Sequence, residues 1–306
     1  MAYDLAIIGG GPAGVAAGVY AARKRLKTVF ITKDFDGQSA VATDIQNWIG
    51  TISISGAELA KNLELHLRAY AADNLEIKKG ETVSKISKND SIFVIDTDKG
   101  RYETKTVLIT VGSRRRALEV PGAQEYFNKG LTYCASCDGP MFADMDVAVI
   151  GGGNAAFDSA AQLLAYTKSV TLIARNSFRA DDITVEKTLK NPRFNALKNT
   201  DILEIKGDKF VNGIMIKNRD TGEIKSLAVQ GIFVEIGSMP NTSFTDGLVE
   251  RDVHDHIIVD PKTQRTSQPG IWAAGDCTDG LYHQNNIAVG DAIKALEDLY
   301  LYLHKK

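Results

Sequence analysis

The stretch Tyr3–Lys24, YDLAIIGGGPAGVAAGVYAARK, has the order of a buried strand, a glycine-rich turn and an alanine-rich helix. Its turn contains Gly9, Gly11 and Gly14 in the pattern Gly-x-Gly-x-x-Gly. The first glycine of this pattern permits the tight turn, the second lets the backbone approach a pyrophosphate, and the third lets helix and strand pack closely. Free N–H groups at the start of the helix also attract phosphate. The stretch therefore predicts a dinucleotide-binding unit.

A second copy of this arrangement lies at Asp146–Arg175, DVAVIGGGNAAFDSAAQLLAYTKSVTLIAR. Its turn contains Gly151, Gly153 and Ala156, and in both copies the next strand ends 18 residues after the last position of the pattern. One glycine pattern is weak evidence, because glycine-rich turns are common, but two copies in matched context are specific. They predict an α/β protein with two Rossmann-like dinucleotide-binding domains.

The size and composition are those of an ordinary globular chain. It has 306 residues, which fits about two domains of ~150 residues, with 44% hydrophobic residues and a formal net charge of −2. This near-neutral balance argues against partners such as nucleic acid or a membrane surface. The apolar runs are far shorter than the ~20 residues of a membrane span. Three cysteines do not make a secreted disulfide framework, and a strand begins at once, so we expect no signal peptide and a reducing cytoplasm.

The C-terminal part predicts a further strand at Ile271–Ala274, a Gly275-Asp276 turn and a helix from about Asn285. Asp276 is placed to accept a hydrogen bond from a ribityl or ribose hydroxyl. The alternative is that Asp276 only stabilises the turn, as aspartate often does. Two dinucleotides suggest a resident flavin and a diffusible hydride carrier, because electron transfer needs an acceptor beside the donor.

Cys134 and Cys137 have the Cys-x-x-Cys spacing, which is found in zinc sites, structural disulfides and redox pairs. Zinc needs four ligands, but only Cys277 remains, and His254 and His256 are too close in sequence to chelate well. A structural disulfide between such near neighbours constrains little of the unfolded chain. A redox pair fits best, because this turn favours one reactive thiolate and easy disulfide formation. Cys277 is expected to pack as a small hydrophobic residue.

Motifs along the whole chain resemble those of the low-molecular-weight thioredoxin reductases and, equally, the flavoprotein core of bacterial alkyl hydroperoxide reductase. These motifs are IIGGGPAG, DGQ, DIQNWIG, YCASCDGPMF, VIGGGNAAFDSA, GIFVEIGSMPNT and GIWAAGDCT. Both groups belong to the flavoprotein pyridine nucleotide-disulfide oxidoreductases. The resemblance implies a discontinuous FAD-binding domain, residues 1–116 and 246–306, with an NAD(P)H-binding domain, residues 117–245, inserted in it. It also implies a homodimer.

The resemblance implies roles for the cysteines and their neighbour. Cys137 would be the sulfur beside the flavin, and Cys134 the exposed sulfur that attacks the disulfide of a partner. Asp138 would donate and accept the proton, while an N-terminal helix cap remains the alternative for this residue. The inserted domain would rotate between the two half-reactions, because nicotinamide and disulfide need the same region of the flavin.

The family's motifs also imply cofactor contacts. The residues expected at FAD are Gly9, Gly11, Pro12, Ala13, Gly14, Thr32, Gly37, Gln38, Asn47, Val83, Gly112, Gly275, Asp276, His283 and Gln284. Those expected at NAD(P)H are Gly151, Gly153, Asn154, Ala156, Arg175, Arg179 and Gly237.

The nicotinamide donor is expected to be NADPH. The strand end of the inserted domain offers Arg175 and Arg179 and no acidic residue, and two guanidinium groups favour a 2′-phosphate. NADH and a ferredoxin are the alternative electron donors. The alternative interpretation of the two arginines is that they are solvated surface charges. The basic run Arg114–Arg116 is expected to be a solvated turn rather than a partner site.

The expected function is a thioredoxin-disulfide reductase, in which electrons pass from NADPH through FAD and Cys134–Cys137 to a small protein such as thioredoxin. Three alternatives stay open. They are an NADH-dependent disulfide reductase of a peroxiredoxin system, a ferredoxin-fed thioredoxin reductase, and a non-catalytic flavin-binding redox sensor.

Overall fold

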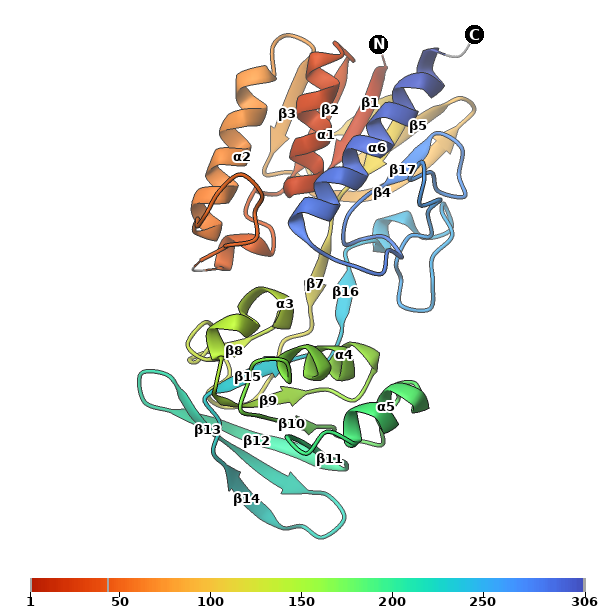
Figure 1. Ribbon diagram of the computed structural model, residues 1–306. Helices are drawn as coiled ribbons and strands as arrows, with labels where there is room; N and C mark the ends of the chain where they lie inside the picture. The colour runs from red at the N-terminus through yellow and green to blue at the C-terminus, as the bar shows by residue number, and fades with distance from the viewer. Residues whose placement is uncertain (1, 43, 305–306) are drawn as a thin grey trace. The chain divides into compact units, whose positions relative to one another are not determined.

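The computed structural model describes residues 2–42 and 44–304 and divides into two compact units. Unit 1 comprises Met1–Arg114 and Met239–Lys306, and unit 2 comprises Arg115–Ser238. The chain crosses between them in strands β7 (Ser113–Arg115) and β16 (Ser238–Pro240), which pair as a two-stranded sheet (Figure 1). The domain limits implied by the resemblance lie two and seven residues further along the chain.

Unit 1 contains a seven-stranded sheet in the order β3-β2-β1-β6-β5-β4, with β17 also paired to β6. Its strands are β1 (Tyr3–Ile8), β2 (Thr28–Thr32), β3 (Leu75–Lys79), β4 (Val83–Asn89), β5 (Ile92–Thr97), β6 (Arg101–Ile109) and β17 (Ile271–Ala273). The start of β6 pairs antiparallel with β5, whereas its end pairs parallel with β17. This long strand therefore joins the C-terminal segment to the N-terminal dinucleotide-binding motif.

Three helices of unit 1, α1 (Pro12–Arg23), α2 (Gly56–Tyr70) and α6 (Asn285–His304), contribute to one core on the sheet. Side chains alternate along β1, because successive residues of a strand point to opposite faces. Leu5 and Ile7 pack with the helices, whereas Ala6 and Ile8 pack in the second core with residues of β4 and β5. The glycine-rich turn follows directly at the carboxyl end of this central strand.

Unit 2 contains a parallel five-stranded sheet in the order β11-β10-β9-β15-β8. Its strands are β8 (Leu131–Thr132), β9 (Asp146–Ile150), β10 (Ser169–Ile173), β11 (Phe194–Leu197) and β15 (Gly231–Val234). One face packs on α3 (Ala135–Asp138), α4 (Asn154–Leu163) and α5 (Asp182–Leu189). The other face packs on the antiparallel sheet β12 (Thr200–Gly207), β13 (Val211–Asn218) and β14 (Ile224–Leu227).

These two units confirm the predicted class, an α/β protein with two Rossmann-like units. The predicted strand, turn and helix order is present in both copies, with element ends shifted by one or two residues. Three short 3₁₀ turns, η1 (Ser39–Val41), η2 (Gly139–Phe142) and η3 (Ser243–Thr245), complete the described elements. Across residues 2–42 and 44–304, no helix is both long and apolar enough to cross a membrane.

Candidate active site

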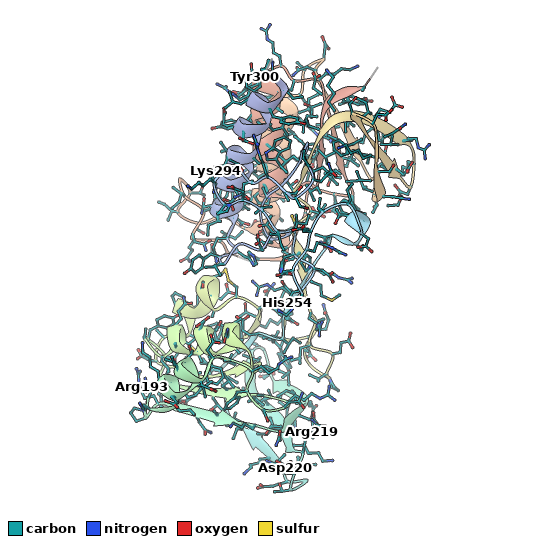
Figure 2. All side chains as sticks on the ribbon, turned by 90° about the vertical axis from the view of Figure 1, so that its right-hand side faces the viewer. Arg193, Arg219, Asp220, His254, Lys294 and Tyr300 are labelled. Carbon is teal, nitrogen blue, oxygen red and sulfur yellow. A yellow bond between two sulfur atoms is a disulfide. The ribbon has the colours of Figure 1, made fainter. Side chains whose placement is uncertain are left out.

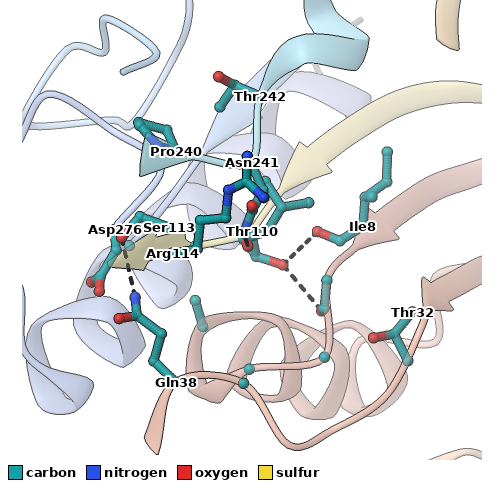
Figure 3. Close-up of a pocket in the computed structure, with 18 of the residues that line it drawn as sticks. Ile8, Thr32, Gln38, Thr110, Ser113, Arg114, Pro240, Asn241, Thr242 and Asp276 are labelled. Carbon is teal, nitrogen blue, oxygen red and sulfur yellow. Dashed lines mark hydrogen bonds between the residues drawn. The ribbon is translucent and has the colours of Figure 1, made fainter. Parts of the chain in front are cut away.

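In the first glycine-rich turn, the position of Gly11 is open, whereas Gly9 and Gly14 are in close contact with backbone atoms. Gly9 has φ +118°, and a Cβ there would lie 2.4 Å from the carbonyl oxygen of Thr110. A Cβ on Gly14 would lie 1.9 Å from the carbonyl oxygen of Gly9, whereas nothing lies within 4 Å of one on Gly11. The Thr110 hydroxyl donates to the Ile8 carbonyl over 2.9 Å and so joins the turn to the end of β6 (Figure 3). The backbone at Gly11 is therefore open to a pyrophosphate.

A cavity of about 860 Å³ surrounds this turn within unit 1. That volume lies near the upper end of the ~300–1,000 Å³ that ligand pockets usually have. The residues predicted at FAD that line it are Gly9, Gly11, Pro12, Ala13, Thr32, Gly37, Gln38, Val83, Gly112, Gly275 and Asp276. The structure thus brings together segments from both ends of the chain at one cavity.

Four residues predicted at FAD do not line the cavity. Gly14 is a buried residue of helix α1 that packs against the backbone of Gly9. Asn47 and Gln284 bond to each other instead, with 3.1 Å between Asn47 Nδ2 and Gln284 Oε1. The fourth, His283, is exposed, and its ring lies 6.0 Å from that of His256.

The return segment after β16 contributes lining residues that sequence reasoning missed. Asn241, Thr242, Arg251 and Asp255 line the cavity, and Asn241 Nδ2 donates to the Val111 carbonyl over 3.1 Å (Figure 3). Asn241 and Thr242 end the GIFVEIGSMPNT motif, whereas nothing in the sequence around Arg251 and Asp255 indicates that they line a cavity.

The expectation for the basic run was wrong in its conformation, although Arg114–Arg116 are all exposed, as expected of solvated residues. Ser113–Arg115 is strand β7 rather than a turn, and Arg114, although exposed, lines the cavity. Beside it, Ser113 accepts a 3.1 Å hydrogen bond from Gln38 Nε2 (Figure 3). An extended conformation arises here because β7 pairs with β16, which no signal near Arg114 could reveal.

Cys277 has the buried position that the sequence predicted. Its side chain is fully buried in the core beside β6, and its Sγ faces the carbonyl oxygens of Ile109 and Ala274. Burial raises the pKa of the Cys277 thiol to about 12, which keeps the sulfur protonated and unreactive.

The second glycine-rich turn has the same steric pattern within unit 2. A Cβ on Gly151 would lie 2.3 Å from the carbonyl oxygen of Glu235, and nothing lies within 4 Å of one on Gly153. Ala156 is fully buried at the third position. Sequence reasoning missed Glu235, which follows β15: its carboxylate accepts a 2.7 Å hydrogen bond from Ser159 Oγ, and burial raises its pKa.

The remaining residues predicted at NAD(P)H lie at the carboxyl end of the same sheet. Asn154 starts α4, and its Oδ1 accepts a hydrogen bond from the Asp181 N–H. Arg175 follows β10, and its Nε lies 3.2 Å from Asp201 Oδ1. Arg179 is exposed and makes no ion pair within the described residues. Gly237 has φ +104° after β15.

Cys134 and Cys137 form a disulfide at the start of α3, with their Cα atoms 5.3 Å apart. Cys134 is the helix N-cap, because its Sγ accepts a 3.2 Å hydrogen bond from the Cys137 N–H. Asp138, the alternative cap expected from the sequence, instead takes the N-cap position of η2, where its side chain makes no capping hydrogen bond. Of the pair, Cys137 is exposed and Cys134 is half-buried, whereas Cys134 was expected to be the exposed sulfur.

Asp138 lies at the end of α3, in a partly buried position that raises the pKa of its carboxyl. The hydroxyl of Thr132, on β8, donates to this carboxyl and accepts a 3.3 Å hydrogen bond from the Cys134 N–H. The opposing, smaller influences on the pKa are this hydroxyl and the positive charge of Arg115. One buried threonine thus connects the disulfide turn to a carboxyl that holds its proton tightly.

No cluster of three or more His, Cys, Asp or Glu residues in the described ranges has the geometry to hold a metal ion. A disulfide is reduced by electrons that arrive in pairs, and nucleotide cofactors deliver electrons in that form. Unit 2 combines a disulfide with a dinucleotide-binding turn, and unit 1 has a second such turn with a large cavity. These features define the class of dinucleotide-dependent disulfide oxidoreductases.

A family model described as pyridine nucleotide-disulphide oxidoreductase matches residues 3–292. The chain belongs to this family, which confirms the resemblance seen in its motifs.

Relatives within this family have different names. The chain is 39% identical over 303 residues to an NADH dehydrogenase of Bacillus subtilis, covering 98% of this chain and 58% of that protein. It is 40% identical over 296 residues to an alkyl hydroperoxide reductase (the F subunit) of Pseudomonas putida, covering 96% of this chain and 57% of that protein. The chain thus spans less than three fifths of the length of these relatives.

Solved structures of similar length also match. Thioredoxin reductase from Streptococcus pyogenes MGAS5005 has a TM-score of 0.91 and 36% identity, with 98% of each chain covered. Thioredoxin reductase from Giardia duodenalis has a TM-score of 0.94 and 32% identity, with 99% of each chain covered.

Proposed function

We propose that the protein is an FAD-dependent disulfide reductase that passes electrons from NADPH through Cys134–Cys137 to a small protein disulfide, with thioredoxin as the partner. The observation on which this rests is the disulfide beside Asp138, a carboxyl with a raised pKa, in a unit that has its own dinucleotide-binding turn. Similarity over nearly the full length to solved thioredoxin reductases supports it. The cytoplasm and a homodimer are part of the same proposal.

The cavity of unit 1 fits FAD. Gly11 has no atom within 4 Å of a Cβ position, so its backbone can approach a pyrophosphate, and Asp276 and Gln38 offer polar groups for the rest of the cofactor. When bound there, FAD supplies two-electron redox chemistry between nicotinamide and disulfide.

Reduction of the Cys134–Cys137 bond takes two electrons and two protons and yields two thiols. The raised pKa of Asp138 keeps its carboxyl protonated to higher pH than an ordinary aspartate, so it can donate one of these protons to the departing thiolate. The Cys134 thiolate then attacks the disulfide of the partner, forms a mixed disulfide and releases one partner thiol. Attack by Cys137 on Cys134 Sγ re-forms the Cys134–Cys137 bond and releases the second partner sulfur. The two thiol protons of the pair pass to the two partner sulfurs, and Asp138 recovers from solvent the proton that it gave.

The exposure of Cys137 supports its role as the sulfur that faces the cofactor. Cys137 lies on the surface of its unit, where a group held by the other unit can reach it, whereas the half-buried Cys134 has to become more exposed before it attacks a partner. We further propose that residues 115–238 rotate about the two crossings, β7 and β16, between half-reactions. A bifunctional reagent that joins the two units, checked by peptide mapping, should stop turnover with flavin still bound, and unimpaired turnover would contradict the rotation.

A second candidate is an NADH-dependent disulfide reductase in a peroxiredoxin system. The similarity to the alkyl hydroperoxide reductase protein of Pseudomonas putida favours it. The exposed guanidinium groups of Arg175 and Arg179 at the end of β10 favour NADPH instead.

An anaerobic titration of the yellow protein with NADPH and with NADH, followed by addition of oxidised thioredoxin, tests both candidates. NADPH should bleach the flavin at lower concentration, and thioredoxin should restore its colour. Cys134→Ser and Cys137→Ser should each abolish thioredoxin reduction, while Cys277→Ala, which removes the third and buried thiol, should retain it. A colourless protein, or full thioredoxin reduction by Cys137→Ser, overturns the proposal.

A further inference from the structure

A third arginine lies at the end of β10, beside the residues that the sequence indicated. Arg219 follows β13, and its Nη1 donates to the Arg175 carbonyl over 3.2 Å and to Asn176 Oδ1 over 2.8 Å. Its backbone is also held, because the Arg219 N–H donates to the Asn199 carbonyl over 2.7 Å. The adjacent hairpin β13–β14 thus fixes a guanidinium group against the strand end. Figure 2 labels Arg219 and its neighbour Asp220.

Asp201, at the start of β12, holds two guanidinium groups together. Its Oδ1 lies 3.2 Å from Arg175 Nε, and its Oδ2 lies 3.6 Å from Arg219 Nε. Asp220, which neighbours Arg219 in sequence, is engaged elsewhere, since its Oδ2 accepts a hydrogen bond from Asn199 Nδ2. The two arginines therefore share one carboxylate, and the group of three side chains has a net positive charge.

Both guanidinium groups keep N–H groups for a ligand. The Arg175 side chain is 77% exposed and that of Arg219 is 44% exposed. Within the described chain, the two Nη groups of Arg175 make no hydrogen bond, and the same holds for Nη2 of Arg219. A guanidinium offers five N–H donors in a planar fork that matches phosphate oxygens.

The position of Arg175, Arg219 and Asp201 in the Rossmann unit determines which phosphate of a bound nucleotide the two arginines can contact. In a Rossmann unit the end of the second strand lies beside the adenosine ribose, and the residue there binds the 2′-hydroxyl or accommodates the 2′-phosphate. In unit 2 the second strand is β10, which pairs with β9 and ends two residues before Arg175. The pyrophosphate, by contrast, is expected at the open turn near Gly153.

We propose that Arg219 is a specificity-determining residue that binds the 2′-phosphate of NADPH together with Arg175, and that Asp201 positions both side chains. This inference rests on the proposed function, in which unit 2 binds the nicotinamide nucleotide. It adds a residue from a separate hairpin, more than 40 positions beyond Arg175 in sequence, to the two arginines near the strand.

Nucleotide fragments without nicotinamide test the proposal on the full FAD-containing protein. Calorimetric titration with 2′,5′-ADP and with 5′-AMP measures the contribution of the 2′-phosphate alone, without any electron transfer. The wild-type protein should bind 2′,5′-ADP more tightly. In Arg219→Gln, which keeps a hydrogen-bond donor but no charge, the ratio of the two affinities should fall about tenfold, as expected for the loss of a charge-assisted contact. Affinity for 5′-AMP should not change.

Lys225→Ala is the matched control, since it removes one positive charge from β14 of the same hairpin, where Lys225 pairs with Glu223. It should leave the ratio at the wild-type value. An unchanged ratio in Arg219→Gln overturns the proposal, as does an equal loss for both fragments, which would indicate a merely structural role. A wild-type ratio of one also overturns it, and thioredoxin reduction with NADH in that case would leave the disulfide reductase function standing.

Discussion

The two glycine-rich turns share a sequence pattern, but they differ at the third position. A Cβ on Gly14 would overlap the Gly9 carbonyl oxygen at 1.9 Å, so α1 begins in direct contact with its turn. At the matching place in unit 2, Ala156 accommodates a methyl group and is fully buried. The first turn is therefore the tighter of the two, and it borders a cavity of about 860 Å³. Under the proposed function, the tighter turn belongs to the unit that holds FAD and the other turn to the unit that binds NADPH.

The acidic residues of the two units differ as well. In unit 1 the buried Glu81 is held by hydrogen bonds from the hydroxyls of Thr97 and Tyr102. In unit 2 burial raises the pKa of both Asp138 and Glu235, and each has one hydroxyl partner. Under the proposed function, unit 1 holds the resident ligand and Asp138 of unit 2 transfers the proton.

The largest effect is expected from Asp138→Asn, which removes the proton donor of unit 2. Loss of general acid–base help should slow disulfide reduction by about 10²–10⁴-fold. Reduction of the flavin by NADPH should keep its rate, and stopped-flow absorbance separates the two steps. Thr132→Ser, which retains the hydroxyl that donates to Asp138, is the control. Equal slowing of both steps would mean that Asp138 does not act on the disulfide.

Exchange of the third positions tests the difference between the turns. Gly14→Ala should destabilise unit 1 by about 3 kcal/mol or more, because the new methyl meets backbone rather than a flexible side chain. The reciprocal change Ala156→Gly should cost only about 0.5–1 kcal/mol, the usual penalty of glycine within a helix. Denaturant unfolding and bound flavin absorbance measure both effects. If Gly14→Ala is as stable as Ala156→Gly, the two turns are sterically equivalent.

The second positions should affect ligands rather than stability. Gly11→Ala and Gly153→Ala place a methyl where no protein atom lies within 4 Å, so the fold should tolerate both. Each methyl should obstruct a pyrophosphate and weaken its own ligand by about 1–3 kcal/mol, the usual cost of overpacking. Flavin retention should fall in Gly11→Ala alone, and NADPH affinity in Gly153→Ala alone. Loss of flavin from Gly153→Ala would contradict the assignment of one ligand to each unit.

The smallest effect is expected from Glu235→Gln. Because burial raises the pKa of Glu235 in the folded state, its ionisation costs stability as pH rises from the ordinary glutamate pKa through the raised value. The variant should therefore be more stable than wild type at pH 7, and the difference should disappear on acidification. Chemical denaturation across this pH range measures it. Glu204→Gln, at an exposed residue of the same unit, should change stability by no more than about 0.5 kcal/mol.

Local patterns were sufficient for the two strand–turn–helix motifs and for the redox pair. Gly9 and Gly151 could be recognised because steric rules act within a few residues of each turn. The pairing of Cys134 with Cys137 follows the same logic, because a short turn limits which sulfurs can meet.

Residues that reach a site through long-range pairing were not predictable in this way. Arg114 was expected in a solvated turn, but β7 pairs with a strand more than 120 positions later and turns it to the cavity. Glu235 and Arg219 directly follow strands β15 and β13, whose local sequence indicates only a sheet. Their roles depend on which strand ends meet, and that is a property of topology.

The sequence by itself determined the two nucleotide-binding turns, the reactive cysteine pair and membership of a family, because these depend on spacing between near neighbours. Only the tertiary structure decided that Asp201 bridges Arg175 and Arg219, and that Cys137 is the more exposed sulfur. The physical reason is that burial, and the contacts it imposes on charged and polar groups, are set by strands that pair across long stretches of the chain.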